Sequence, residues 1–369
     1  MRKWISLMCA AGIAAAALMG CSGAETAGKN ETKAAAEVAA GESAESLSSE
    51  ETKKEEDKKE LTKIVVSEFR GICWASAYAA EQLGYFEEEG LDVEFMLYKD
   101  GPIAFQGMHA GDSDFCLLSA EPVMTAYDEG MESYLLLTNT NRRTYAFAGA
   151  ADIKTAADLK GKTIFAGMPG SAPYSFVLSM LKSAGLSEND VNFINLDYGS
   201  AIVALGEKQV DGIFFDVYNK AILEETVPDA NILLDCTDTQ THEALYGSQF
   251  CQTSIVTCTK KFAEENPETV QAFVNASSRA LKWISEHTSK ELAELISPMY
   301  DSMTVDELTA KFECIKDTFS ETGEIIPEGY ETMESFCLDQ GLIENSIPYE
   351  DIVASDFMDA AIENKTRQT

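Results

Sequence analysis

A loop around residue 170 combines residue types that bind small polar groups. It contains Gly170, Ser171 and Ala172, and Tyr174 follows two residues later. Glycine lets the backbone approach a ligand closely, and a helix that begins at a capping serine offers free N–H groups and positive potential. The pattern therefore favours contact with an anion or a carbonyl group. Simple capping of the next helix is the alternative explanation for Ser171.

Charged residues of both signs occur in the neighbouring loops. Arg70, Arg142 and Arg143 could each hold an anion through paired hydrogen bonds, although surface exposure is the simpler explanation for two of the three. Glu121 and Asp216 favour the opposite ligand, one that is cationic or rich in donors, such as an aminopyrimidine. Asp216 could instead cap a helix. These residues leave the charge of the ligand open.

Aromatic and hydroxyl side chains complete the candidate set. Trp74 could stack on a ring or cover an alkyl chain, and core packing is the alternative. We predict no catalytic residue, metal ligand or cofactor. The predicted ligand contacts are Arg70, Trp74, Ser119, Glu121, Arg143, Gly170, Ser171, Ala172, Tyr174 and Asp216.

Alternating strands and helices are predicted to bring these loops together. Glycines at the predicted helix ends, such as Gly84, Gly111 and Gly185, are typical stop signals. The alternation predicts two halves, each a parallel sheet with covering helices, and helices only from residue 260 onward. Ligands of such sheets bind beyond the carboxyl ends of the strands. The expected strands are 63–69, 91–95, 114–118, 133–138, 162–166, 191–196 and 212–215.

The composition excludes one class of partner. The 369 residues carry a formal net charge of −34, and −31 of it belongs to residues 61–369. Nucleic-acid binding needs a basic surface, so we exclude it. A strongly acidic surface keeps an exported protein soluble. A small anionic ligand is not excluded, because the field inside a pocket can oppose the global charge.

The first 60 residues have the composition of an export signal and a tether. Arg2 and Lys3 precede an apolar run of about 16 residues, which is short for a membrane-spanning helix of roughly 20. The end of this run, Leu18-Met19-Gly20-Cys21, resembles the lipobox of bacterial lipoproteins, in which the cysteine is lipidated. We predict a signal peptide at 1–20 and a lipidated Cys21 that begins a disordered acidic tether, 21–60. A plain secretory signal is the alternative.

Seven cysteines remain when Cys9 and Cys21 are set aside. Seven is odd, no C-x-x-C occurs, and the spacings do not match a zinc site. We predict mostly free, buried thiols.

Several motifs resemble the solute-binding proteins of ABC importers for nitrate, sulfonates, taurine and thiamine precursors. Each motif is weak alone, but their order over roughly residues 62–290 is specific. The matching segments are 84–93, 111–115, 158–162, 170–171, 185–186, 190–191, 210–212 and 262–268. The resemblance implies an α/β, type 2 periplasmic-binding-protein fold, with two lobes, a hinge and a ligand cleft. It places two crossing strands near 145–149 and 249–257.

The same resemblance implies the organisation and activity of the chain. Lobe 1 would comprise 61–148, lobe 2 149–249, and 250–369 the hinge return with C-terminal helices on lobe 1. The protein would be a lipid-anchored, monomeric, extracytoplasmic binding component that delivers a small solute to a membrane permease and its ATPase. A ligand sensor that signals to a membrane receptor is one alternative. A thiamine-pyrimidine synthase-like enzyme is the other, and it is disfavoured because the chain lacks that enzyme's cysteine-rich motif.

Overall fold

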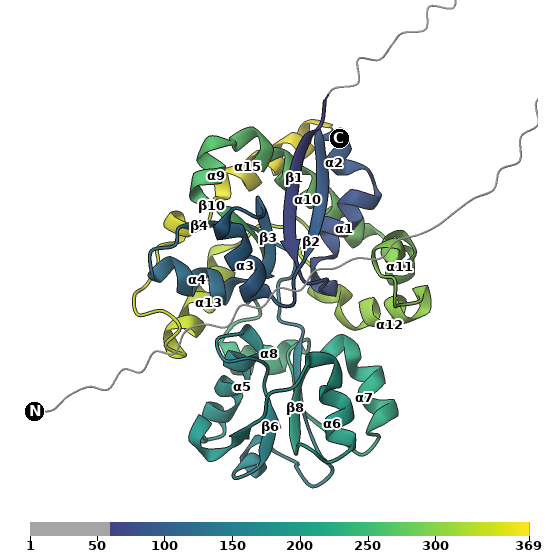
Figure 1. Ribbon diagram of the computed structural model, residues 1–369, viewed down its shortest axis with the longest axis vertical. Helices are drawn as coiled ribbons and strands as arrows, with labels where there is room; N and C mark the ends of the chain where they lie inside the picture. The colour runs from purple at the N-terminus through teal and green to yellow at the C-terminus, as the bar shows by residue number, and fades with distance from the viewer. Residues whose placement is uncertain (1–59, 369) are drawn as a thin grey trace, which may run out of the picture. The chain divides into compact units, whose positions relative to one another are not determined.

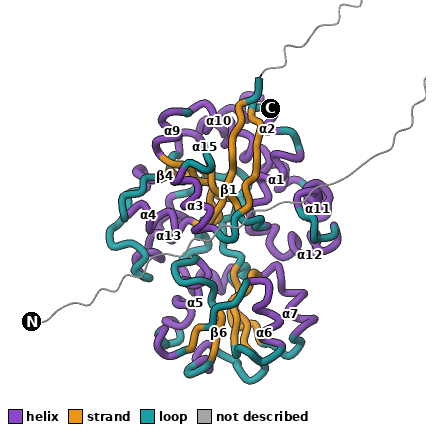
Figure 2. The backbone as a smooth tube through the Cα atoms, in the orientation of Figure 1, coloured by secondary structure: helices purple, strands orange, loops and turns teal. Residues whose placement is uncertain are grey.

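A computed structural model describes residues 60–368 of the chain. The predicted signal peptide, Cys21 and the tether up to residue 59 lie outside the described residues. The described strands form two five-stranded sheets, which Figure 2 draws as separate orange groups flanked by helices. We call each sheet with the helices packed on it a lobe.

Sheet 1 has the strand order β2-β1-β3-β10-β4. β1 is parallel to β2 and β3, whereas β10 is antiparallel to β3 and β4. The sheet is therefore mixed, and the prediction of a purely parallel sheet is wrong. Its strands are β1 (Thr62–Glu68), β2 (Leu91–Leu97), β3 (Phe115–Ser119), β4 (Ser133–Thr138) and β10 (Ser254–Thr259).

Helices from both ends of the described chain cover sheet 1 (Figure 1). α10 packs against α1, α2 and α15, and its Phe273 stacks on Phe115 of β3 with ring centroids 4.2 Å apart. α13 packs on α4, and α11 packs against both α12 and α1. The helices of lobe 1 are α1 (Ala75–Gln82), α2 (Tyr85–Glu88), α3 (Gly101–Ala110), α4 (Ala120–Asp128), α9 (Lys260–Glu265), α10 (Pro267–Glu286), α11 (Ser289–Ile296), α12 (Val305–Ile315), α13 (Pro327–Asp339), α14 (Tyr349–Ile352) and α15 (Ser355–Gln368).

Sheet 2 repeats this design with the order β7-β6-β8-β5-β9. β6 is parallel to β7 and β8, and β5 lies antiparallel between β8 and β9. The strands are β5 (Tyr145–Gly149), β6 (Thr163–Phe165), β7 (Asn192–Phe193), β8 (Gly212–Asp216) and β9 (Asn231–Asp235). The helices are α5 (Ala172–Ser183), α6 (Ala201–Gly206), α7 (Lys220–Thr226) and α8 (Thr239–Tyr246).

The chain crosses between the sheets in irregular segments beside the predicted crossing strands. β5 and β10 are paired on both sides within one sheet each, so neither strand spans the lobes. The crossings are the irregular segments 139–144 and 247–253, which lie beside each other because the Cys251 N–H donates to the Asn141 carbonyl at 2.9 Å. The predicted strand 191–196 shortens to two residues, and β9 and α8 were not predicted.

Candidate functional site

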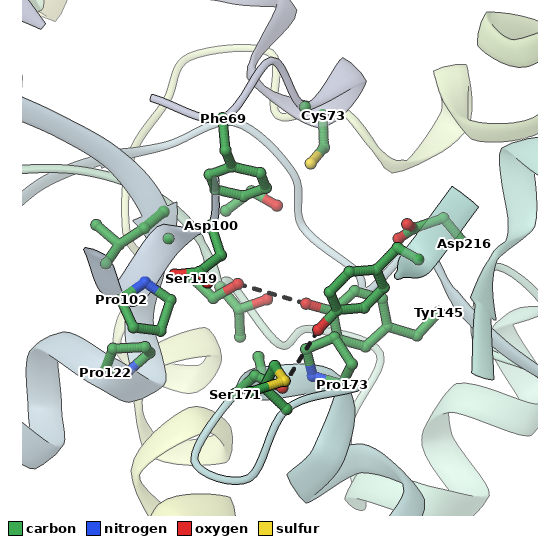
Figure 3. A pocket seen from close by; sticks show the side chains of 18 of the residues that line it. Phe69, Cys73, Asp100, Pro102, Ser119, Pro122, Tyr145, Ser171, Pro173 and Asp216 are labelled. Atoms are coloured by element: carbon green, nitrogen blue, oxygen red, sulfur yellow. Dashed lines mark hydrogen bonds between the residues drawn. The ribbon is translucent and has the colours of Figure 1, made fainter. Parts of the chain in front are cut away.

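A cavity of about 520 Å³ lies where the loops of both lobes meet the two crossing segments. This volume is typical of a pocket for a small organic molecule. The residues around it follow the carboxyl ends of β1, β2, β3, β6, β7 and β8, as the rule for open α/β sheets predicts. Figure 3 shows Asp216 and Tyr145 on one side of the cavity, with Ser119, Pro102 and Pro122 opposite them.

One wall of the cavity is aromatic. Trp74 is buried, donates its Nε1–H to the Ile255 carbonyl at 3.1 Å and meets the edge of Phe69 with ring centroids 4.8 Å apart. Gly71 makes this packing possible, because a Cβ there would lie 2.4 Å from the Trp74 ring. Trp74 is thus a fixed wall rather than a mobile lid.

The opposite wall comes from sheet 2. Tyr145 and Phe214 lie with ring centroids 5.1 Å apart, and Tyr198 packs on Phe214 at 6.1 Å. The Tyr145 hydroxyl lies 3.4 Å from the Ser119 hydroxyl, a contact that joins the two lobes at the cavity (Figure 3). The cavity therefore offers flat apolar surface on both sides and hydroxyl groups between them.

The loop around residue 170 caps a helix, as predicted. Ser171 is the N-cap of α5 and accepts the Tyr174 N–H at 3.4 Å, while the Tyr198 hydroxyl donates to Ser171 at 3.5 Å. Gly170 is exposed and lies outside the cavity lining, and its φ of +81° shows that it serves the turn rather than a close ligand approach. Tyr174 packs on Phe193 instead of facing the cavity.

Both arginines at the cavity are already paired with buried carboxylates. Arg143 Nη1 lies 2.5 Å from Glu121 Oε1, and both side chains are at most 1% exposed. Burial disfavours the guanidinium charge, yet Glu121 raises the pKa of Arg143 above its ordinary value. Arg70 Nη2 lies 3.0 Å from Glu68 Oε1, and Arg142 donates to the Asp317 carbonyl outside the cavity.

Asp216 is an acid of the cavity lining that forms no ion pair within residues 60–368. It ends β8, and no cationic nitrogen within residues 60–368 lies within 4 Å of its carboxylate. The residue precedes a short 3₁₀ turn, but its side chain makes no capping hydrogen bond, so the helix-cap alternative fails. Burial raises the pKa of Asp216 to about 6, while the Tyr218 hydroxyl and the charge of Lys311 lower it.

The structure brings most of the predicted contacts together. The cavity is lined by Arg70, Trp74, Ser119, Arg143, Ser171, Ala172 and Asp216. It is not lined by Glu121, Gly170 or Tyr174. The prediction omitted Asp100 and Tyr198, which follow β2 and β7, because the loops after those strands were not considered as ligand loops. It also omitted Tyr145, which opens β5 and which the family resemblance placed in a crossing strand.

The thiols of the described chain are free, as predicted. Six of the seven are buried, and burial raises the pKa of Cys116 to about 12, so it is inert at neutral pH. Among residues 60–368, no three histidine, cysteine or acidic side chains are grouped to hold a metal ion. Every helix in this range is too short or too polar to span a lipid bilayer.

The model of the family described as NMT1/THI5 like matches residues 73–290. A Bacillus subtilis (strain 168) protein named for binding aliphatic sulfonates is 28% identical over 293 residues, which cover 75% of this chain and 81% of that protein. The formylaminopyrimidine-binding protein of Halalkalibacterium halodurans is 21% identical and covers 75% of this chain and 84% of its own length. These two relatives are named for ligands of different chemistry.

Solved structures are similar to this chain in fold. A protein from Bordetella bronchiseptica RB50 superposes with a TM-score of 0.73 at 22% identity, over 83% of this chain and 99% of that one. The desulfurization enzyme DSZB superposes with a TM-score of 0.59 at 14% identity, over 82% and 99%. The same architecture thus occurs in an enzyme, so the fold alone does not decide between binding and catalysis.

Proposed function

The chain belongs to the NMT1/THI5-like family, and on this basis we propose that it is the extracytoplasmic solute-binding component of an ABC importer. The cleft captures a small solute, the lobes close around it, and the closed form delivers it to a membrane permease that works with an ATPase. No chemistry on the solute is required. The protein acts as a monomer that a lipid on Cys21 holds at the membrane, with residues 21–60 as its tether.

One observation carries this proposal: the cavity is built jointly by both lobes and both crossing segments. Lining residues come from loops of sheet 1, from loops of sheet 2 and from 143–144 and 253 on the crossings. A ligand there touches both lobes at once, so binding and closure are coupled. Closure also excludes water, which strengthens each polar contact inside.

Contacts between the lobes support a hinge that can close and reopen. Gln340 at the end of α13 donates to Ser179 of α5 at 3.0 Å, and Lys182 donates to the Asp339 carbonyl at 3.3 Å. On another helix, Lys311 of α12 donates to Asn219, which follows β8. These three contacts are polar, and polar contacts between domains permit relative motion of the lobes.

The histidines support binding rather than catalysis. None of the three lines the cavity within the described chain. His109 contacts the Ser133 hydroxyl, His242 is buried against the Ser248 carbonyl, and His287 stacks on Trp283. A synthase-like reaction that uses a histidine at the cleft therefore has no support here.

The test is a thermal-shift screen of the purified protein against nitrate, taurine, alkanesulfonates, bicarbonate and thiamine pyrimidines. A ligand at a hundred times its dissociation constant stabilises the folded state by about 2.7 kcal/mol. Small-angle scattering should then show closure with the same ligand, and cells without the gene should lose uptake of it. Stabilisation by none of these solutes would rule out these ligand classes, and normal uptake of a stabilising solute without the gene would refute the proposal.

A matched pair of variants makes the test specific to the cavity. Ser119→Phe places a ring inside the cavity, whereas Ser285→Phe places one on the exposed side of α10. We expect the first to lose ligand stabilisation and the second to keep it. Equal binding by both variants would place the ligand elsewhere.

A further inference from the structure

The charges around the cavity do not form an anion cradle. Glu68 and Glu121 are buried directly behind the two lining arginines and neutralise them. Lys99 also lines the cavity, but it is 78% exposed and lies 3.8 Å from Asp197. An anion at either arginine would also lie close to the buried carboxylate that already pairs with it, and that negative charge would repel the anion.

The two acids of the lining, unlike the two arginines, form no ion pair among residues 60–368. Asp100 caps α3 by accepting the Ile103 N–H at 3.0 Å. Asp216 has no cation within 4 Å among residues 60–368. Lys311, whose charge lowers the pKa of Asp216, is held by Asn219, lies 5.3 Å from the Tyr218 ring centroid and does not line the cavity.

Aromatic rings surround this carboxylate because of strand register. Tyr145 of β5 pairs directly with Asp216 of β8, so the two side chains leave the sheet on the same face. Phe214 lies two residues earlier on β8 and shares that face, and Tyr218 follows two residues later. A carboxylate flanked by aromatic rings is suited to a positively charged nitrogen, which gains both ion pairing and cation–π attraction.

We propose that the solute is an organic cation, with a protonated or quaternary nitrogen at Asp216 and an aromatic or apolar body that extends between Trp74 and the tyrosines. This inference rests on the proposed function and names its ligand class. The cavity mouth fits such a body, because Ile103 and Met168 line it and are each 44% exposed. The net charge of −34 attracts cations to the protein and repels anions.

The experiment measures binding of three probes with one body and different charge: benzyltrimethylammonium, benzyl alcohol and benzenesulfonate. Thermal shift and calorimetry on the purified protein should give concentration-dependent stabilisation by the ammonium probe, at least about tenfold weaker binding of the alcohol, and no stabilisation by the sulfonate. Tighter binding of the sulfonate than of the ammonium would overturn the inference and leave the proposed function intact. Absence of ammonium binding up to millimolar concentrations would also overturn it.

Two further measurements locate the contact. Asp216→Asn should weaken ammonium binding at least about tenfold, and Asp229→Asn, an exposed charge loss on the same lobe, should leave it unchanged. Equal binding by Asp216→Asn and the wild type would overturn the inference.

The pH profile covers the case in which Asp216→Asn does not fold. The charge of a quaternary probe does not titrate, so its binding to the wild type should weaken as pH falls below about 6 and Asp216 takes up a proton. The other titratable groups around Asp216 are Tyr218, Tyr145, Tyr198 and Cys73, whose pKa values burial raises, and Lys311, whose pKa burial lowers. Constant affinity from pH 7.5 to 5 would contradict the assignment.

Discussion

Removal of one charge from the Glu121–Arg143 pair should strongly destabilise the fold. Glu121→Gln keeps the shape of the side chain but leaves the guanidinium without a counter-charge. Both side chains are at most 1% exposed, and the distance of 2.5 Å between Nη1 and Oε1 is that of a tight ion pair. Loss of one partner of such a pair costs about 3–5 kcal/mol, because the remaining charge is neither solvated nor paired.

The rings around Arg143 reduce this cost only in part. The guanidinium carbon lies 4.6 Å from the Phe336 ring centroid and 5.1 Å from that of Tyr246. Each buried cation–π contact contributes about 1–2 kcal/mol and still stabilises the unpaired guanidinium in Glu121→Gln, but these contacts do not replace the lost ion pair. The expected loss therefore stays near the lower half of the range, about 3–4 kcal/mol.

The assay is chemical denaturation of Glu121→Gln, Arg143→Met and the double variant Glu121→Gln with Arg143→Met. The double variant should be far less destabilised than the sum of the single variants, because no unpaired charge remains in the core. Lys99→Met, which breaks the exposed pair with Asp197, is the control and should show no measurable change. A loss below about 1 kcal/mol in Glu121→Gln, or additive losses in the cycle, would refute the electrostatic argument.

Three further predictions follow from single contacts. Burial lowers the pKa of His242 to about 4, below its ordinary 6.5. The contribution of neutral His242 to the free energy of unfolding is therefore complete above pH 6.5 and falls by up to about 3 kcal/mol as the pH drops toward 4. His242→Gln should flatten this part of the stability profile, and an unchanged slope would contradict the prediction. Gly71→Ala should displace the Trp74 ring, weaken solute binding at least about tenfold and change the tryptophan fluorescence. An unaltered spectrum and affinity would show that the Trp74 side chain accommodates the added methyl group. Lys311→Met should loosen the contact with Asn219 and shift the unliganded protein toward the open form in small-angle scattering, whereas an identical scattering profile would exclude a latch here.

The sequence predicts the local elements well because each has a short-range cause. Apolar alternation marked β1, β2 and β8 within two residues of their ends, and Gly111, with a φ of +89°, ends α3 as expected. Ser171 caps α5 because a capping serine acts on a backbone N–H three residues away. The family resemblance added what these local signals lack, the two-lobed arrangement.

Sheet order was beyond the local signals. β10 lies between β3 and β4, which precede it by more than 100 residues, and β5 lies between β8 and β9. Each of these strands is antiparallel because the chain enters it from the other lobe. The residues of a strand do not determine which strands pair with it. The sequence pattern therefore predicted parallel sheets where the structure has mixed ones.

The sequence alone determined most of the loops that stand near the cleft, because loops at strand ends meet at one edge of a sheet. The tertiary structure alone decided what those residues can do there. Arg143 and Glu121 had seemed to favour ligands of opposite charge, but they neutralise each other once folding brings them together and removes water. Asp216 stays available because its strand register places Tyr145 rather than a cation beside it. The charge that a binding site presents to a ligand depends on which charged residues pair and how deeply they are buried, and residue spacing determines neither.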